Sequence, residues 1–156
     1  MRVHLCAVGR LKAGPERALV DDYLTRFDRT GRPLGLGPAT EHEVEDRKAM
    51  GMVSEGVLLS RSLPAGAMVA VLDERGSVLS SPDFAGELSR WRDGGRQDVA
   101  FVIGGPDGID ASLRARADFA LSFGRMVWPH LLVRVMLAEQ LYRAATILGG
   151  GPYHRT

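Results

Sequence analysis

Two uninterrupted apolar runs in the second half of the chain constrain its fold most strongly. Residues 67–72 and 99–103 contain no polar side chain, and each run leads directly into a turn-like segment. Strands without polar alternation are typical of a parallel sheet that is covered on both faces. Helical periodicity lies between and around these runs. The sequence therefore predicts an α/β fold, a mostly parallel sheet with helices on both faces.

The remaining elements follow from periodicity and from glycine and proline positions. Further strands are expected at 2–9 and 119–123, and a turn at 73–76. Pro15 opens a first helix, Ser81 caps a third, and Asp110 caps a short fourth. A second helix is expected at 46–62 and a long final helix at 131–148, whereas 34–43 is ambiguous. The length of 156 residues suits a single domain, 1–156.

Composition excludes several classes of protein. No run reaches the roughly 18 apolar residues of a membrane span. The lone Cys6 cannot form an internal disulfide, and the four dispersed histidines suggest no metal site, so a cytoplasmic protein is expected.

The formal net charge is only +1, yet both ends of the chain are basic. Residues 1–32 carry seven Lys and Arg against four acids, and 121–156 carry four against one. The middle compensates with Glu41, Glu43, Glu45 and Asp46. The basic ends could meet to contact phosphates, or they could be ordinary solvated charge.

Ligands of parallel α/β sheets bind beyond the carboxyl ends of the strands. This rule selects 72–76, 104–108 and 123–130. In the second segment, Gly104-Gly105-Pro106-Asp107-Gly108 matches neither the dinucleotide fingerprint nor the Walker A loop. It is either a tight turn or a loop whose backbone approaches a ligand.

Charged and aromatic residues near the end of the chain are further candidates. His130, in the first turn of the long helix, is a capping residue or a general base. Arg134 lies among leucines and valines, so it must face a partner subunit, a ligand anion or an internal carboxylate. Tyr153, His154 and Arg155 could stack on a base and hold a phosphate, or form a frayed terminus.

Taken in order, these segments resemble a known family. The residues that carry the likeness are 8–12, 69–73, 101–108, 120–123, 129–135 and 152–155. Together they are similar to the bacterial ribosomal RNA large subunit pseudouridine N3-methyltransferase (RlmH) family of the SPOUT superfamily. The likeness covers essentially the whole chain, although 34–52 matches poorly.

The resemblance implies a SPOUT-type C-terminal trefoil knot and a homodimer with the long helix in its interface. It implies that S-adenosyl-methionine is the cofactor and that N3 of a pseudouridine in 23S ribosomal RNA is methylated on the assembled ribosome. The cofactor-binding residues would be Leu72, Gly104, Gly105, Phe123, Gly124, Arg125, Met126, Val127 and Trp128.

For the reaction, Arg134 and the partner's tail with Tyr153 and His154 are expected on the acceptor side. His154 is the first candidate base, His130 the second, and water a third. Arg155, Arg10 and Lys12 are expected to contact RNA. The alternatives are a SPOUT methyltransferase acting on another RNA, such as transfer RNA, and a non-catalytic nucleotide-binding module.

Overall fold

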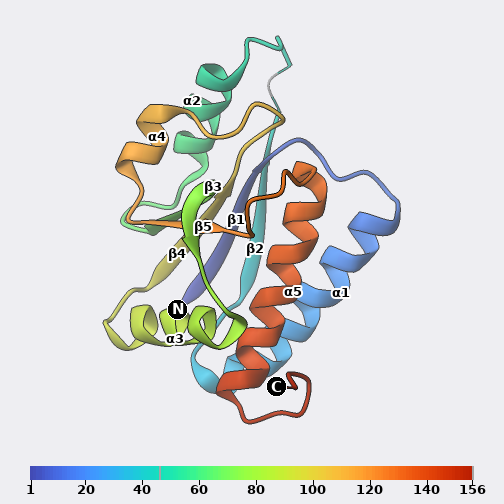
Figure 1. Cartoon of the computed structure of the whole chain (residues 1–156), viewed down its shortest axis with the longest axis vertical. Helices are drawn as coiled ribbons and strands as arrows, with labels where there is room; N and C mark the ends of the chain where they lie inside the picture. The colour runs from blue at the N-terminus through green and yellow to red at the C-terminus, as the bar shows by residue number, and fades with distance from the viewer. Residues whose placement is uncertain (46, 156) are drawn as a thin grey trace.

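The computed structural model describes residues 1–45 and 47–155, and these form a parallel sheet with helices on both faces (Figure 1). The sheet order is β2-β1-β4-β3-β5, and every neighbouring pair is parallel. The strands are β1 (Arg2–Val8), β2 (Ala39–Val44), β3 (Met68–Val78), β4 (Asp98–Ile103) and β5 (Phe119–Ser122). The predicted α/β class is confirmed.

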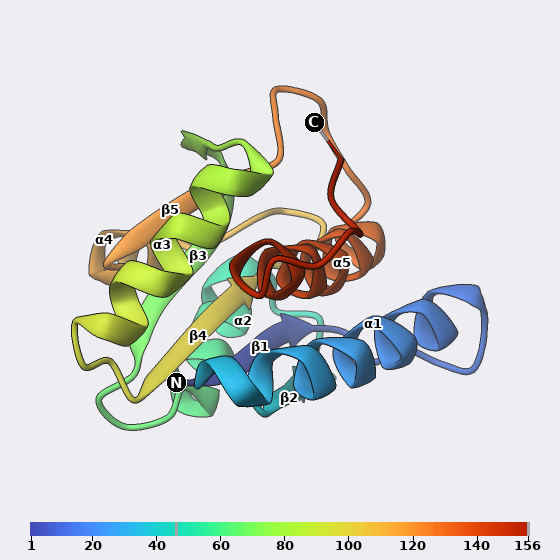
Figure 2. The same ribbon diagram turned by 90° about the horizontal axis from the view of Figure 1, so that it is seen from below.

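The helices divide between the two faces of the sheet (Figure 2). The helices α1 (Pro15–Gly31), α3 (Ser81–Asp93) and α5 (His130–Leu148) cover one face, whereas α2 (Met52–Ser62) and α4 (Ala111–Arg116) cover the other. A short 3₁₀ turn, η1 (Arg32–Leu34), follows α1. No helix in the described part of the chain is long and apolar enough to cross a membrane.

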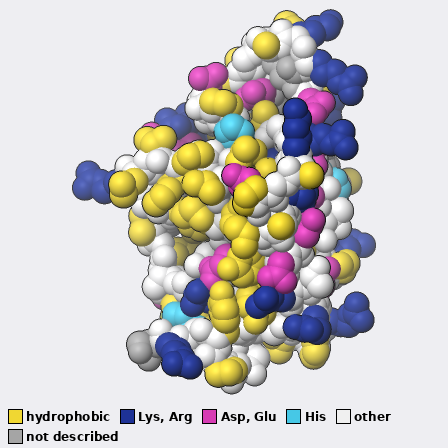
Figure 3. Space-filling view, turned by 90° about the vertical axis from the view of Figure 1, so that its right-hand side faces the viewer, with side chains coloured by type: hydrophobic (Ala, Val, Ile, Leu, Met, Phe, Trp, Pro, Cys, Tyr) yellow, Lys and Arg dark blue, Asp and Glu magenta, His cyan; other side chains and the backbone are white. Residues whose placement is uncertain are grey.

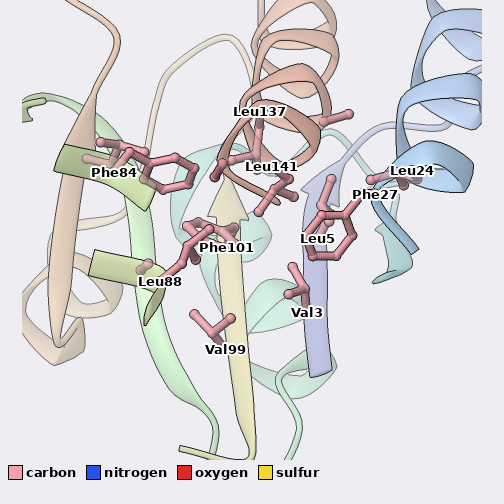
Figure 4. Close-up of a cluster of buried hydrophobic side chains, with 14 of the residues drawn as sticks. Val3, Leu5, Leu24, Phe27, Phe84, Leu88, Val99, Phe101, Leu137 and Leu141 are labelled. Carbon is pink, nitrogen blue, oxygen red and sulfur yellow. The ribbon is translucent and has the colours of Figure 1, made fainter. Parts of the chain in front are cut away.

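Each central strand contributes side chains to two hydrophobic clusters, one on each face of the sheet. In β4, all six residues are buried. Phe101 and Val99 point to the α1–α3–α5 side and contact residues such as Leu137 (Figure 4), while Ala100 and Val102 belong to the cluster under α2. Because neighbouring residues of a strand face opposite sides, both sets must be apolar. This burial explains the uninterrupted apolar runs.

The prediction of a turn at 73–76 was wrong, since β3 continues to Val78. Leu72 and Ser77 both pair with Leu121, so the residues between them are extra to the ladder. Gly76 lies so close to β5 that an added Cβ would sit 2.6 Å from the carbonyl carbon of Ala120. Residues 73–76 therefore form a bulge-like irregularity inside β3 and not a turn between two elements.

Several element boundaries also differ from the sequence predictions. The second helix begins at Met52, after Gly51 with φ 90°; Asp46, its expected start, lies outside the described residues. The ambiguous segment contains the edge strand β2. Ser80, not Ser81, caps α3 by accepting a hydrogen bond from the Asp83 amide at 3.2 Å. The long helix starts one residue earlier, at His130. The trefoil knot stays a prediction of the resemblance.

Candidate functional site

A cavity of about 280 Å³ opens at the carboxyl ends of β3, β4 and β5. The three segments selected by the strand-end rule meet in it, together with the start of α5. Its lining residues are Leu72, Asp73, Glu74, Arg75, Ile103, Gly104, Gly105, Pro106, Asp107, Gly108, Ile109, Leu121, Phe123, Gly124, Met126, Val127, Trp128, His130 and Val133. Eight of the nine cofactor candidates thus lie together; Arg125 is exposed and does not line the cavity.

The glycine segment after β4 is both a tight turn and a wall of this cavity. The Gly108 amide donates to the Gly105 carbonyl at 3.0 Å. A Cβ added to Gly104 would overlap the carbonyl group of Gly108, and Gly108 itself has φ 89°. A left-handed backbone of this kind favours glycine. The two interpretations that the sequence left open are therefore compatible.

A buried carboxylate at the cavity was missing from the predicted site. Asp73 accepts hydrogen bonds from Arg75 Nε at 2.8 Å and Nη2 at 3.0 Å, and Arg114 Nη1 lies 3.4 Å away. The Arg75 guanidinium lowers the pKa of Asp73 to about 2, with a smaller contribution from Arg114. The Asp73 carboxyl group is thus ionised, and the guanidinium groups of Arg75 and Arg114 compensate its negative charge. Its position directly after an apolar run was the available signal.

The loop after β5 forms the exposed wall of the cavity. Met126 and Val127 are 72% and 85% exposed, respectively. At the base of this loop, the Ser122 hydroxyl donates to the Glu74 carbonyl at 3.2 Å and accepts from the Gly124 amide at 3.1 Å. A fixed base with an exposed apolar tip suits a wall that contacts a ligand or partner.

His130 is the catalytic candidate that lines the cavity within one chain. Burial, and secondarily the nearby charge of Arg134, lower the pKa of His130. Its Nε2 atom is 3.8 Å from the position that a Cβ of Gly9 would take. His130 is therefore held neutral near pH 7 beside the end of β1.

Arg134 is almost fully buried, at 1% exposure, and its partner is internal. Its Nη1 donates to Glu43 Oε2 at 2.7 Å and lies 3.4 Å from Glu41 Oε2; its Nη2 donates to the Gly9 carbonyl at 2.8 Å. Of the three partners considered from the sequence, the internal carboxylate is the one observed. Glu41 and Glu43 are two residues apart, so both side chains lie on the same face of a strand. This spacing was the sequence signal for an acidic partner of Arg134, and it was missed.

The C-terminal tail folds back onto α5, far from the cavity in the same chain. The Tyr153 hydroxyl donates to Glu139 Oε1 at 3.0 Å, and the Arg143 guanidinium lies 4.7 Å from the Tyr153 ring centroid. Burial and the Glu139 carboxylate raise the pKa of Tyr153. His154 Nδ1 is 3.4 Å from Arg143 Nη1, and Arg155 is exposed.

The contacts of the tail along α5 set its distance from the cavity. Glu139 and Arg143, which the tail contacts, come nine and thirteen residues after His130, a rise of about 14 Å and about 20 Å. His130 stands at one end and the tail follows the other (Figure 1). One chain therefore does not bring Tyr153, His154 and Arg155 to its own cavity.

A second hollow, largely apolar, lies along α5. Its volume is about 390 Å³, and its lining residues come from α1, α5, the end of β5 with Phe123, and the segment from the end of β3 into α3. Leu19 and Val78 at its border are 44% and 67% exposed. Hydrophobic side chains gather across the middle of the face shown in Figure 3. An apolar surface of this kind is typical of a protein contact.

Comparison with known proteins gives a consistent result. The family model described as "Predicted SPOUT methyltransferase" matches residues 1–154. Proteins named "Ribosomal RNA large subunit methyltransferase H" from Ruegeria sp. (strain TM1040) and Ruegeria pomeroyi are 70% and 71% identical over 155 residues, covering 99% of both chains in each case.

Among solved structures, one described as "Structural insights into the 2-OH methylation of C/U34 on tRNA" aligns with a TM-score of 0.50 and 17% identity. The alignment covers 93% of this chain and 91% of that one, a likeness of fold alone. The family model and the full-length relatives settle the assignment: this chain belongs to the SPOUT methyltransferase family.

Proposed function

We propose that this methyltransferase uses S-adenosyl-methionine to methylate N3 of a pseudouridine in 23S ribosomal RNA, on the assembled ribosome in the cytoplasm. The observation that carries the proposal is the meeting of three strand-end loops in one cavity, in a chain 70% identical to a protein named for large subunit RNA methylation. That name supports large subunit ribosomal RNA as the substrate, and the resemblance of the motifs in this chain implies N3 of a pseudouridine.

The cavity suits this cofactor in size and chemistry. Apolar side chains such as Ile103, Leu121 and Val133 provide surfaces for a flat base, while the glycine segment after β4 presents backbone groups. A Cβ at Gly108 or Gly124 would meet open space, so neither segment fills the cavity itself. When bound there, S-adenosyl-methionine supplies an activated methyl group on a sulfonium. Leu72, Gly104, Gly105 and the loop 123–128 would hold it.

The chain must position the acceptor nitrogen and accept its proton. The pseudouridine N3–H is a weak imide acid, so a nearby base and a nearby cation both lower the barrier. His154 of a second copy is our first candidate base, followed by neutral His130 and by water. Tyr153 of the same tail lines the acceptor side. Arg134 acts as a positioning residue, because both of its Nη atoms already donate, one to Glu43 and the other to the Gly9 carbonyl.

The separation between the tail and the cavity supports a homodimer. The tail packs on Glu139 and Arg143, about 14 Å and about 20 Å along α5 from His130 of its own chain. The apolar hollow beside α5 offers the surface for a second copy, which could bring its tail to this cavity. Arg155 of that tail, with Arg10 and Lys12, would then contact the RNA.

Mass mapping of ribosomal RNA from a deletion strain tests the proposed function. A single pseudouridine in 23S RNA should lack its N3 methyl group, and purified protein with S-adenosyl-methionine should restore it on isolated ribosomes. Loss of methylation from transfer RNA instead would favour the alternative SPOUT substrate. Calorimetry with S-adenosyl-methionine, ATP and NAD distinguishes an enzyme from a nucleotide-binding module, which would prefer one of the latter two.

A further inference from the structure

Two pairs of exposed cations lie just after the carboxyl ends of β1 and β2, at the same end of the sheet as the cavity. Arg10 and Lys12 come after β1, and Arg47 and Lys48 come after β2. The last residues of the two strands, Val8 and Val44, are paired, so the two segments leave the sheet side by side. Arg10 and Arg47 line one hollow together with Glu43 and Glu45. We call Arg10, Lys12, Arg47 and Lys48 the basic rim.

The basic rim adjoins the cavity through Gly9. The Cβ position of Gly9 lies 3.8 Å from Nε2 of His130, which lines the cavity. Lys and Arg side chains also gather along the upper edge of the face shown in Figure 3. An RNA strand lying on the rim would therefore pass the entrance to the cavity.

The first half of the rim is held in place by a buried ion pair. Arg134 of α5 donates to the Gly9 carbonyl at 2.8 Å and to Glu43 Oε2 at 2.7 Å. The same Glu43 oxygen accepts the Leu11 amide at 2.6 Å. Because residues 9 and 11 are both fixed, Arg10 and Lys12 have a defined place relative to α5, which lowers the entropic cost of binding.

The rim cations are available to an anion. Arg47 is 88% exposed, and its distance to Glu45 is 3.7 Å. Among the described residues, Arg10, Lys12 and Lys48 form no ion pair. At the opposite edge of the sheet, by contrast, Arg2 pairs with Asp98 at 2.7 Å and Arg92 with Asp93 at 2.8 Å. The four cations of the basic rim can thus reach phosphates without first breaking a close ion pair.

We propose that the basic rim binds the phosphate backbone of the substrate RNA and so places the acceptor base over the cavity. The inference rests on the proposed function and adds Arg47 and Lys48 to the surface that recognises the substrate. Long, flexible cations that follow a strand edge contact phosphates without reading sequence. The rim therefore determines affinity and register, while the cavity selects the base.

The test compares two charge-neutralised variants of the full-length protein. R47Q/K48Q removes the newly assigned half of the rim. R32Q/R96Q removes two exposed cations that precede β2 and β4 at the opposite edge. Binding to ribosomes from the deletion strain is measured by filter retention at several KCl concentrations, and cofactor affinity by calorimetry with S-adenosyl-methionine.

We expect R47Q/K48Q to weaken ribosome binding about tenfold at low salt. The slope of log K against log [KCl] should flatten by about 1.4, near 0.7 for each lost phosphate contact to single-stranded RNA. Cofactor affinity should stay at the wild-type value, and R32Q/R96Q should match the wild type. A slope for R47Q/K48Q equal to that of the wild type would overturn the inference.

Hydroxyl-radical footprinting of 23S RNA on intact ribosomes distinguishes RNA from ribosomal protein as the partner of the rim. RNA backbone that the wild type protects and R47Q/K48Q leaves exposed supports phosphate contacts, whereas identical protection by both proteins contradicts the inference. Failure of the wild type to methylate ribosomes would refute the proposed function itself. A wild type that methylates while R47Q/K48Q binds normally would refute only the rim.

Discussion

The buried guanidinium of Arg134 is the residue on which the geometry near the cavity most depends. It connects α5 to the ends of β1 and β2 through Gly9 and Glu43. Its location shows why an arginine among leucines is tolerated: carboxylates and carbonyl oxygens from elsewhere in the chain compensate its charge.

Replacing Arg134 tests this structural role. R134M should lower the free energy of unfolding by about 3 kcal/mol, because Glu41 and Glu43 lose their buried partner. R26M, which removes an exposed pairing with Asp22 on α1, should cost much less than R134M. Urea denaturation of both variants measures the difference. Equal losses of unfolding free energy in R134M and R26M would mean that the buried Arg134 pair stabilises the protein no more than an exposed one.

Gly104 tests the tight wall of the cavity in a similar way. In G104A, the new methyl group overlaps the Gly108 carbonyl, so the segment must shift. We expect a loss of about 1–3 kcal/mol in stability and at least tenfold weaker binding of S-adenosyl-methionine. The control is G86A on α3, where a Cβ meets open space. Unfolding and calorimetry should leave G86A unchanged or slightly more stable, by up to about 1 kcal/mol. Normal cofactor binding by G104A would contradict the assignment of this wall.

At the scale of elements, a polar cluster joins the amino-terminal ends of β1 and β4 to the middle of β2. Asp98 accepts from Arg2 Nε and Nη2, each at 2.7 Å, and lies 2.8 Å from His4 Nε2. His4 Nδ1 is in turn 3.0 Å from His42 Nε2. The cluster thus ties the edge strand to the centre of the sheet.

This cluster predicts a stability term that depends on pH. The Arg2 guanidinium and, secondarily, His4 lower the pKa of Asp98 to about 2 in the folded state. Since the unfolded value is about 3.9, the contribution is complete above about pH 5 and is lost as the pH falls toward 2. D98N should therefore destabilise the protein by about 1 kcal/mol at pH 7 and by clearly less at pH 2.5. Urea unfolding at both pH values measures this. An equal penalty at both values would exclude the ionised carboxylate as its source.

The sequence predicted those elements whose signal is local. The apolar runs of β3 and β4 were found because burial on both faces of the sheet leaves no polar residue, and the long α5 was found from its mostly apolar sequence. The strand-end rule then brought together the correct three loops. The edge strand β2 was missed, since its alternation of Glu41, His42 and Glu43 makes sense only beside His4 and Arg134.

Non-local contacts account for the other differences. The continuation of β3 beyond residue 72 depends on pairing with β5, nearly 50 residues later. The Arg134–Glu43 pair is separated by 91 residues. Neither relation has a signature within a window of a few residues, so periodicity alone could not have given them.

At the scale of the whole molecule, the proposed function requires that each reaction site lie between two copies of the chain. One copy would contribute the cavity at the strand ends, and the other would contribute the tail with His154. Two variants separate these contributions. V133W should fill the cavity from α5 but leave the tail intact. H154A removes the candidate base from the tail but leaves the cavity intact. Each variant alone should transfer methyl groups at least a hundredfold more slowly than the wild type.

Mixing the two variants measures the shared site directly. After exchange of subunits, the mixture should recover about a quarter of the wild-type rate of methyl transfer to ribosomes. Half of the dimers are then mixed, and each mixed dimer has one intact site. A mixture as inactive as the separate variants, or an H154A variant as active as the wild type, would contradict the composite site on which the account depends.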